Sequence, residues 1–429
     1  MKAPYVDEPT GPAAERYLAA TPSSRALSTE ARRVMPGGST RAYGFFKPYP
    51  VVFDHGAGPY LWDLDGRRYV DFTYNGLSLI HGHAYAPVQE ALFDAIPRGT
   101  AWVGPSRSQV DYASMLCERI PTAERVRFTN TGTEATMLAT KLARRATGRP
   151  LILKSYGAYH GSYDDLEAGL YGIGNLPGRT VLGRFGDIES FEQAFAEYGE
   201  QIAAVIIEPV LLTFRVAAPP PGFLPALVDL ARRHGALVIV DDCLMFRLAP
   251  GGSAQKYNFE PDLTCLGKFI GGGVPMGVVA GSEEVLGLLD SRREGSVYHG
   301  GSFNGNPLAC TAGLIALEHL TAQRIADMDR RAEQLRTSLR ERATAAGLPV
   351  EVTGEGSVLG SYVLGPDGEP DRETGAYLHL AAIDRGVFFG PDGEMALCTR
   401  LDDEALEFTI EAMTGAIEET AEWAAASVR

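Results

Sequence analysis

The sequence predicts an α/β protein with one large domain around a mostly parallel sheet and a smaller α+β domain built from both ends of the chain. Short, fully apolar runs alternate with helical patterns through the middle of the chain, which is typical of a parallel sheet covered on both faces. The 429 residues exceed one ordinary domain of roughly 150 residues, and 45% of them are hydrophobic. After about Asn306 the alternation gives way to helices.

The expected elements follow in order along the chain. A helix near Ser23–Val34 precedes a strand and hairpin region at Val51–Phe72, where glycines split the apolar runs. The expected central strands are 125–128, 150–153, 203–207 and 236–240, and the helices among them are 134–146, 190–198 and 224–234. Helices over 308–329, 330–346 and 402–425 close the chain. We expect an N-terminal segment over 1–80, a large domain over 81–315 and a small α+β domain over 316–429.

Composition argues against several function classes. The formal charge of −15 disfavours nucleic acid and an anionic membrane as partners, since both bind through a basic face. No apolar run approaches the roughly 18 residues that span a bilayer, and the first residues carry no signal region, so we expect a cytoplasmic protein. The five cysteines form no CxxC pair, which disfavours a disulfide framework or a zinc site.

Polar residues that could carry chemistry follow several of the predicted strands, where ligands bind in such sheets. The turn Asn130–Glu134 places a glycine at a helix start, whose free N–H groups favour phosphate, although alone such a turn is more often a helix cap. Glu208 and Asp241 each end an apolar run. A carboxylate in that position needs a cationic partner, with a helix cap or loop hydrogen bond as the alternative.

Lys268 lies between an apolar run and three glycines. Burial lowers the pKa of a lysine and makes its amine nucleophilic, as a covalent bond to an aldehyde requires. Alone, Lys268 is more simply a surface lysine, but Asp241 lies 27 residues upstream. An aspartate for a pyridinium N–H, a lysine for an aldehyde and a Gly-Thr turn for a phosphate together describe a pyridoxal phosphate site.

From about residue 30 to the C-terminus, the chain resembles the class III (fold-type I) pyridoxal-phosphate-dependent aminotransferases. The motifs that carry the resemblance are GAGPYLWDLDGRRYVDF, RFTNTGTEATMLATKLARRATGR, YHG, VIIEPV, VDDCLMFRLAPGG, LGKFIGGGVPMG and GGSFNGNPLA, in the family's order. Within the class, the chain is most similar to the branch of glutamate-1-semialdehyde aminomutase and β-amino-acid aminotransferases. The resemblance implies a seven-stranded fold-type I sheet, pyridoxal 5'-phosphate as cofactor and a homodimer with shared active sites, to which the segment 1–80 contributes.

The resemblance also implies a role for each site residue. Lys268 would form the Schiff base and shuttle a proton between Cα and C4′, while Asp241 would keep the pyridine nitrogen protonated. Arg41 matches the arginine that takes the substrate carboxylate in this branch, a task that suits a guanidinium, with a surface cation as the alternative. The other implied cofactor contacts are Thr131, Gly132 and Thr133 at the phosphate, Tyr159 and Cys243 on the two ring faces, His160 packed behind, Glu208 near the ring hydroxyl and Ser302 at the neighbouring subunit's phosphate.

Several residues depart from the family pattern. Gly76 stands where relatives carry an aromatic wall residue, so we expect a larger pocket that admits a bulkier substrate. Arg215 is expected at the surface, with a second anion site as the alternative. Asp392 or Glu394 is expected to meet an amino or hydroxyl group of the substrate.

The leading hypothesis is an aminotransferase that moves an amino group between an amino-acid donor, glutamate by default, and a carboxylate-bearing carbonyl compound in a specialised biosynthetic pathway. The alternative is a glutamate-1-semialdehyde-type aminomutase, in which the amine moves within one molecule; Gly76 and the short segment after Gly161 count against it. Racemase or decarboxylase chemistry on the same scaffold stays open. A non-catalytic binding protein is disfavoured because Lys268 and Asp241 are both present, and a Rossmann protein because no strand precedes G-x-G-x-x-G.

Overall fold

The computed structural model describes residues 11–170 and 178–427. The chain divides into two compact units, one of Ala86–Ile325 and one of Lys2–Tyr85 with Ala326–Arg429. The sequence analysis placed these breaks at 80/81 and 315/316. The segment after Gly161 includes residues 171–177, which lie outside the described residues.

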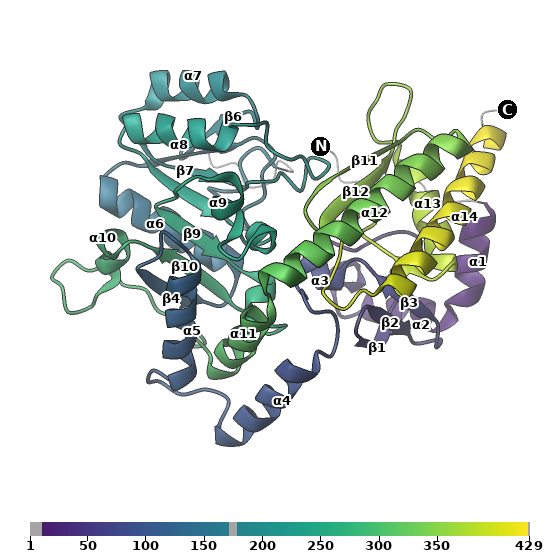
Figure 1. Cartoon of the computed structure of the whole chain (residues 1–429), viewed down its shortest axis with the longest axis horizontal. Helices are drawn as coiled ribbons and strands as arrows, with labels where there is room; N and C mark the ends of the chain where they lie inside the picture. The colour runs from purple at the N-terminus through teal and green to yellow at the C-terminus, as the bar shows by residue number, and fades with distance from the viewer. Residues whose placement is uncertain (1–10, 171–177, 428–429) are drawn as a thin grey trace. The chain divides into compact units, whose positions relative to one another are not determined.

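A seven-stranded sheet forms the centre of the first unit (Figure 1). The strand order is β4-β10-β9-β8-β7-β5-β6. Strand β10 is antiparallel to both neighbours, and every other adjacent pair is parallel, which confirms the predicted mostly parallel α/β sheet. The strands are β4 Arg125–Thr129, β5 Leu151–Ser155, β6 Thr180–Gly183, β7 Ile202–Ile207, β8 Leu237–Asp241, β9 Leu263–Leu266 and β10 Gly277–Gly281.

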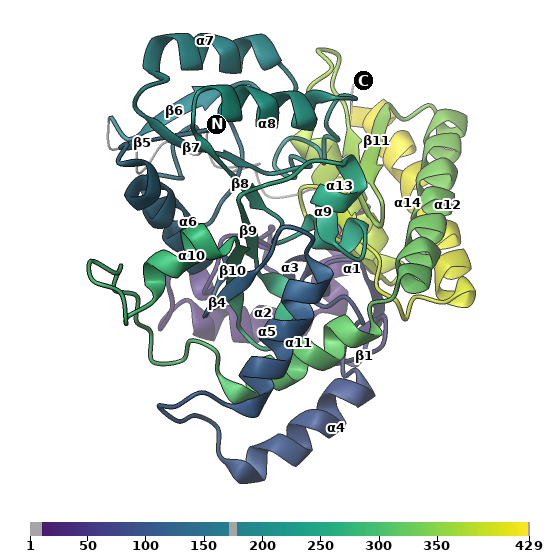
Figure 2. The same cartoon turned by 60° about the vertical axis from the view of Figure 1, so that its left-hand side comes forward.

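Helices cover both faces of this sheet. Successive residues of a strand point to opposite faces, so each strand packs against helices on both sides. Val205 packs in one core cluster with Phe191 and Leu224, whereas the next strand residue, Ile206, packs in another cluster with Leu138. Figure 2 shows α7 and α8 on one side of the strands and α6 on the other. The helices are α4 Ala86–Ala95, α5 Arg107–Arg119, α6 Gly132–Thr147, α7 Ile188–Tyr198, α8 Phe223–Arg233, α9 Gly252–Tyr257, α10 Glu283–Leu286 and α11 Pro307–His319, with 3-10 turns η2 Ile96–Arg98, η3 Met245–Leu248, η4 Lys268–Gly271 and η5 Gly287–Leu289.

The second unit is an α+β structure that combines the two ends of the chain. Strands β1 Phe53–Ala57, β2 Tyr60–Asp63 and β3 Arg68–Asp71 form an antiparallel meander, and β13 Val387–Phe388 pairs in parallel with β3. A separate antiparallel sheet contains β11 Val350–Glu355, β12 Val358–Val363 and β14 Glu394–Ala396. The remaining elements are α1 Pro12–Ala20, α2 Pro22–Ala31, η1 Pro36–Gly38, α3 Tyr74–Leu77, α12 Ala322–Ala346, α13 Arg372–Asp384 and α14 Asp403–Ser427.

One predicted helix boundary was wrong. The sequence analysis divided the helices after Asn306 at 329/330, whereas α11 ends at His319 and α12 begins at Ala322. The Thr321 hydroxyl accepts a hydrogen bond from the Arg324 N–H at 3.3 Å, so it caps the new helix. Threonine is a weak cap signal, and the apolar period continues across the break. The sequence pattern therefore did not indicate this helix boundary.

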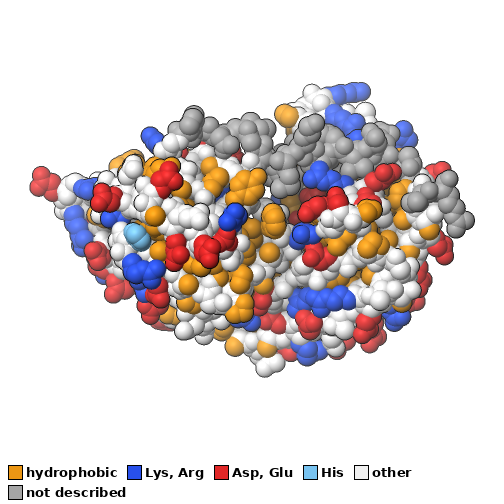
Figure 3. Space-filling view, turned by 90° about the horizontal axis from the view of Figure 1, so that it is seen from above, with side chains coloured by type: hydrophobic (Ala, Val, Ile, Leu, Met, Phe, Trp, Pro, Cys, Tyr) orange, Lys and Arg blue, Asp and Glu red, His pale blue; other side chains and the backbone are white. Residues whose placement is uncertain are grey.

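Three further observations concern the surface, membrane-spanning helices and metal ligands. On the face shown in Figure 3, Lys and Arg side chains are dispersed among Asp and Glu. Within residues 11–170 and 178–427, no helix has the length and apolarity needed to cross a membrane. The same residues contain no group of three or more His, Cys, Asp or Glu side chains placed to hold a metal ion.

Candidate active site

The predicted residues of the first unit follow parallel strands of the central sheet. Asp241 is the last residue of β8, Glu208 directly follows β7, and Lys268 comes two residues after β9. Tyr159 and His160 lie in the loop after β5. Because the carboxyl ends of parallel strands share one edge of a sheet, these side chains leave the same edge.

Asp241 and His160 form a buried pair at this edge. The imidazole Nδ1 lies 2.9 Å from Asp241 Oδ2, and the Cys243 N–H donates to Asp241 Oδ1 at 3.2 Å. His160 is 1% exposed, and its backbone carbonyl accepts from the Thr136 hydroxyl at 2.7 Å. The other ring nitrogen, Nε2, is buried and has no hydrogen-bond partner among the described residues. The pair therefore fixes the orientation of the carboxylate.

The electrostatics of the pair favour an ionised aspartate beside a neutral histidine. Burial by itself would raise the pKa of Asp241, but the hydrogen bond and charge of His160, with the charge of Lys268, lower this pKa below its usual value. Burial lowers the pKa of His160, against the opposing effect of Asp241. A neutral imidazole can donate to an ionised Asp241 only through Nδ1–H, so the contact assigns the tautomer.

Lys268 occupies a sterically unfavourable backbone position within reach of this pair. Its φ of 54° lies in the left-handed region, which costs a residue with a side chain about 1–2 kcal/mol. The lysine is half-buried, and its charge acts on Asp241, Glu208 and Cys243. Such strain persists where the surrounding structure imposes it, and here it falls on the first residue of the turn η4.

Glu208 is held by two backbone N–H groups. Tyr159 N–H donates to Oε2 at 3.2 Å, and Leu212 N–H donates to Oε1 at 3.4 Å. Burial, followed by the charge of Asp241, raises the pKa of Glu208 to about 8. The side chain is therefore a neutral acid at neutral pH and retains a proton to donate.

The N-terminus of α6 forms an anion cradle. Thr131 is the N-cap, and its hydroxyl accepts from the Glu134 N–H at 3.1 Å. The N–H groups of Gly132 and Thr133, in the first turn, have no intrahelical acceptor and favour an anion. A Cβ on Gly132 would lie 2.8 Å from Cys243 Sγ, so glycine permits the close approach of the thiol. Gly161, at φ +94°, packs its Cα against Thr133 in the same way.

These residues fit pyridoxal phosphate on the chemistry of their donor groups. An ionised carboxylate suits a pyridinium nitrogen, a half-buried lysine suits an aldehyde, and a helix N-terminus suits a phosphate. Cys243 lies against Gly132, and burial raises the pKa of its thiol, so it presents a neutral, polarisable surface. The structure thus assembles the predicted Lys268, Asp241, His160, Glu208 and cradle residues within one unit.

Lys154 belongs to this site and was missed in the sequence analysis. It lies in β5, is fully buried, and its Nζ donates to the carbonyls of Ala158, Leu166 and Ala168 at 2.8, 2.6 and 2.9 Å. These bonds hold the loop that carries Tyr159 and His160. Burial lowers the pKa of Lys154 to about 8. The sequence signal that could have identified this residue is a lysine inside the apolar run LILKS.

The other predicted residues are less buried. Tyr159, in the loop after β5, and Ser302 are exposed, and Arg215 is half-buried with φ 58°. Arg41 belongs to the second unit, where its Nη2 donates to Asn75 Oδ1 at 2.8 Å.

An aromatic ring lies beside Gly76. A Cβ on Gly76 would lie 3.5 Å from Cε1 of the Tyr43 ring, which is ordinary van der Waals contact. In the same unit, Asp392 is exposed and Glu394 half-buried.

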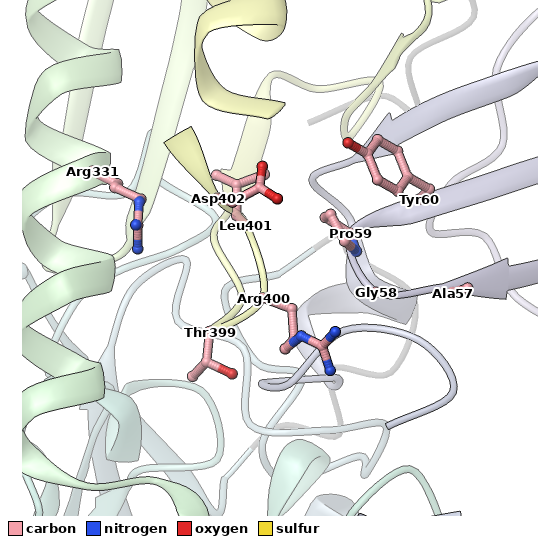
Figure 4. A pocket seen from close by; sticks show the side chains of 9 residues that line it. All are labelled: Ala57, Gly58, Pro59, Tyr60, Arg331, Thr399, Arg400, Leu401 and Asp402. Atoms are coloured by element: carbon pink, nitrogen blue, oxygen red, sulfur yellow. The ribbon is translucent and has the colours of Figure 1, made fainter. Parts of the chain in front are cut away.

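The second unit also contains an open cleft of about 490 Å³ (Figure 4). Its lining includes Tyr60, Arg331, Arg400 and Asp402. The Arg331 guanidinium donates to Asp403 at 2.8 Å and is therefore already paired. None of the predicted site residues lines this cleft.

Comparison with known proteins identifies the family. The family model described as "Aminotransferase class-III" matches residues 46–166 and 185–414. The chain belongs to the class III aminotransferases. Among curated relatives, the glutamate-1-semialdehyde 2,1-aminomutase of Chloroflexus aggregans is 36% identical over 413 residues, which cover 88% of this chain and 92% of that protein. The enzyme of the same name from Heliobacterium modesticaldum is 38% identical over 416 residues, or 91% and 95% of the two chains.

Solved structures similar to this class III aminotransferase include transaminases and an aminomutase. An ω-transaminase from Sphaerobacter thermophilus superposes with a TM-score of 0.88 at 34% identity, covering 93% of this chain and 98% of that one. A glutamate-1-semialdehyde aminomutase from Pseudomonas aeruginosa, solved with PMP, superposes with a TM-score of 0.86 at 25% identity, covering 94% of this chain and 96% of that one. This class III aminotransferase is thus a fold-type I transaminase that uses pyridoxal 5'-phosphate.

Proposed function

We propose that this enzyme moves an amino group between an amino-acid donor and a carboxylate-bearing carbonyl compound in a specialised biosynthetic pathway. The observation that carries the proposal is the buried Asp241–His160 pair beside Lys268, at the edge of a sheet whose neighbouring helix α6 offers free N–H groups. When bound, pyridoxal phosphate supplies an electron sink for the carbanion that forms at the donor's α-carbon.

In this proposal each side chain has a separate task. Lys268 would hold the cofactor covalently and, once the donor's amine has displaced it, its free amine would move a proton between the donor's α-carbon and the cofactor's C4′. Asp241 holds the proton on the pyridine nitrogen, and His160 keeps that carboxylate oriented and ionised. Glu208, as a neutral acid, donates toward the ring hydroxyl. The remaining cofactor contacts are Thr131, Gly132 and Thr133 at the phosphate, with Tyr159 and Cys243 against the ring.

We propose Arg41 as the residue that binds the substrate carboxylate. Its guanidinium is exposed and donates to Asn75 through one nitrogen, which leaves further N–H groups for a carboxylate. The Asn75 amide in turn donates to Ser78 Oγ at 3.0 Å, so the oxygen that faces Arg41 is fixed. This arrangement pre-orients the cation before a substrate arrives.

Intramolecular amino transfer is the second candidate function. Curated relatives at 36–38% identity are named glutamate-1-semialdehyde 2,1-aminomutase, and that observation favours it. Amino transfer between two molecules is favoured by the transaminases among the similar structures. The two functions share the cofactor and the lysine and differ in whether the first product leaves.

We further propose a cytoplasmic homodimer. Trp102 and Phe303, both large and exposed, lie in two loops of the first unit that a hydrogen bond from Asn306 Nδ2 to the Thr100 carbonyl joins. Large exposed apolar side chains on loops that a hydrogen bond joins favour a protein interface, here with a second copy that Ser302 would reach. The five cysteines are free thiols, which supports a reducing compartment.

A donor screen tests the proposed reaction. Purified holoenzyme is mixed with single amino acids, and the loss of cofactor absorbance is followed together with released oxo acid and pyridoxamine phosphate. Stoichiometric oxo acid from glutamate, or from a few β- or ω-amino acids, supports transfer between molecules. If no donor releases an oxo product but glutamate-1-semialdehyde is isomerised, the aminomutase is correct and the proposal is wrong.

A further inference from the structure

A left-handed turn next to Arg41 is a strained segment of the second unit. Tyr74, Asn75, Gly76 and Leu77 all have positive φ, at 39°, 57°, 69° and 62°. Hydrogen bonds from Leu77 N–H to the Thr73 carbonyl at 2.6 Å and from Ser78 N–H to the Tyr74 carbonyl at 2.9 Å close the turn. A left-handed turn of L-residues is unfavourable at each position with a side chain, so its surroundings must impose it.

Asp71 and two buried side chains impose this turn. Asp71 Oδ1 accepts from the Thr73 N–H and hydroxyl, both at 2.7 Å, and Oδ2 accepts from the Tyr74 N–H at 3.0 Å. Tyr74 is 1% exposed and Leu77 2% exposed. With these two side chains buried, Asn75 and Gly76 form the outer part of the turn, and Asn75 meets Arg41 there.

Tyr43 covers the other outer residue of this turn. Its Cε1 and Cδ1 atoms lie 3.5 and 3.7 Å from the position of a Cβ on Gly76, which is ordinary van der Waals contact. A side chain larger than alanine at position 76 would therefore compete with the ring for the same space. Tyr43 is 38% exposed, so part of the ring remains available to a ligand of Arg41, two residues away.

The far end of the Tyr43 ring meets a second acid-bearing turn. Its hydroxyl lies 3.4 Å from the position of a Cβ on Gly390, and Glu394 Oε2 lies 2.8 Å from the same point. The Gly390 N–H donates to the Glu394 carbonyl at 2.9 Å, which closes that turn. Tyr43 thus bridges the Gly76 turn and the Gly390 turn, and its position is determined at both ends.

We propose that Tyr43 is a specificity-determining residue whose ring, held between the Gly76 turn and the Gly390 turn, limits the size of the group next to the carboxylate bound by Arg41. The inference rests on the proposed role of Arg41 in substrate binding. The substrate class that follows is a carboxylate in which the carbon next to the carboxylate group bears a small substituent. This inference takes the place of the expectation of a bulkier substrate.

Binding of two simple carboxylates tests this proposal without turnover. Titration calorimetry on the holoenzyme measures Kd for butyrate and for 3-phenylpropionate. The wild type should prefer butyrate, and Tyr43→Ala should shift the ratio of the two Kd values by about tenfold or more toward 3-phenylpropionate. Tyr43→Phe retains the ring and should retain the wild-type ratio. Phe45→Ala removes an aromatic of similar exposure, 37%, from the same loop and should leave the ratio unchanged.

A compensating pair separates size selection from a merely structural role. Gly76→Phe alone should weaken binding of both carboxylates, because two rings compete for one space. Tyr43→Ala with Gly76→Phe should restore the wild-type preference for butyrate, with a melting temperature above that of Gly76→Phe. Equal ratios in wild type, Tyr43→Ala and Phe45→Ala, or failure of either carboxylate to bind, would overturn the proposal. An enzyme that binds with this selectivity but transfers no amine would instead refute the proposed function.

Discussion

Glu208 allows a sharp test of the electrostatics of the site, through the isosteric substitution Glu208→Gln. Its pKa is raised to about 8, mainly by burial and then by the charge of Asp241, whereas the ordinary value is 4.5. The folded protein therefore keeps this proton up to about pH 8, while the unfolded chain loses it near 4.5. Between those values the folded state binds more protons, so the free energy of unfolding falls as pH rises.

The size of the effect follows from the shift. The difference between about 8 and 4.5 spans roughly 3.5 pKa units, each worth about 1.4 kcal/mol, or about 5 kcal/mol in all. Glutamine does not titrate, so the variant lacks this dependence. It can accept only one of the two N–H groups that Glu208 accepts, which costs about 1–3 kcal/mol at every pH.

Urea unfolding of the apoenzyme from about pH 5 to about pH 8 measures the difference. The stability of Glu208→Gln relative to wild type should rise by about 3.5 kcal/mol across this range, because the titration is already under way at about pH 5 and is only half complete at about pH 8. Glu189→Gln, an exposed acid on α7, serves as the control and should run parallel to wild type. Parallel curves for Glu208→Gln and wild type would refute the assignment of Glu208 as a neutral acid.

Three further substitutions test the remaining parts of the site. Lys154→Met removes the donor to three carbonyls and should speed amide hydrogen exchange across residues 156–168; unchanged exchange would contradict its role in holding that loop. Asp241→Asn should slow the donor half-reaction about 10²-fold or more while cofactor remains bound, and a wild-type rate would exclude Asp241 as the partner of the ring nitrogen. Gly161→Ala, which places a methyl against Thr133, should weaken pyridoxal phosphate affinity about tenfold. Gly157→Ala, also at positive φ but with its nearest neighbour at 3.9 Å, is the matched control, and equal affinities would contradict the cradle.

Residues that follow apolar strands were predictable because the sheet itself brings them together. Asp241 ends a predicted strand and Lys268 follows an apolar run, and the parallel pairing of β8 with β9 brings both residues to one edge of the sheet. Strands β6, β9 and β10 were not predicted, since each is only four or five residues long and two of them contain glycine. Their pairing partners, rather than their own propensity, make them strands.

Contacts between loops that are distant in the sequence could not be predicted from the local sequence pattern. Tyr43 and Gly76 are individually ordinary residues, and only the left-handed turn and the path of the loop bring the ring to the glycine. The sequence pattern therefore indicated a missing aromatic wall at Gly76, but it could not indicate that the Tyr43 ring lies beside this glycine. Lys154 is the opposite case, because a lysine in an apolar strand was a visible signal whose three carbonyl partners only the fold reveals.

The central claim is that Lys268 binds the cofactor, and covalent labelling tests it most directly. Holoenzyme is reduced with borohydride and digested, and mass spectrometry locates the peptide that carries the pyridoxyl group. Lys154 is the main alternative attachment site, since it is a second lysine at the same sheet edge and its pKa is lowered to about 8. The account predicts the label on Lys268 alone, and its absence from Lys268→Ala. A label on Lys154, or on any other lysine of the wild type, would contradict it.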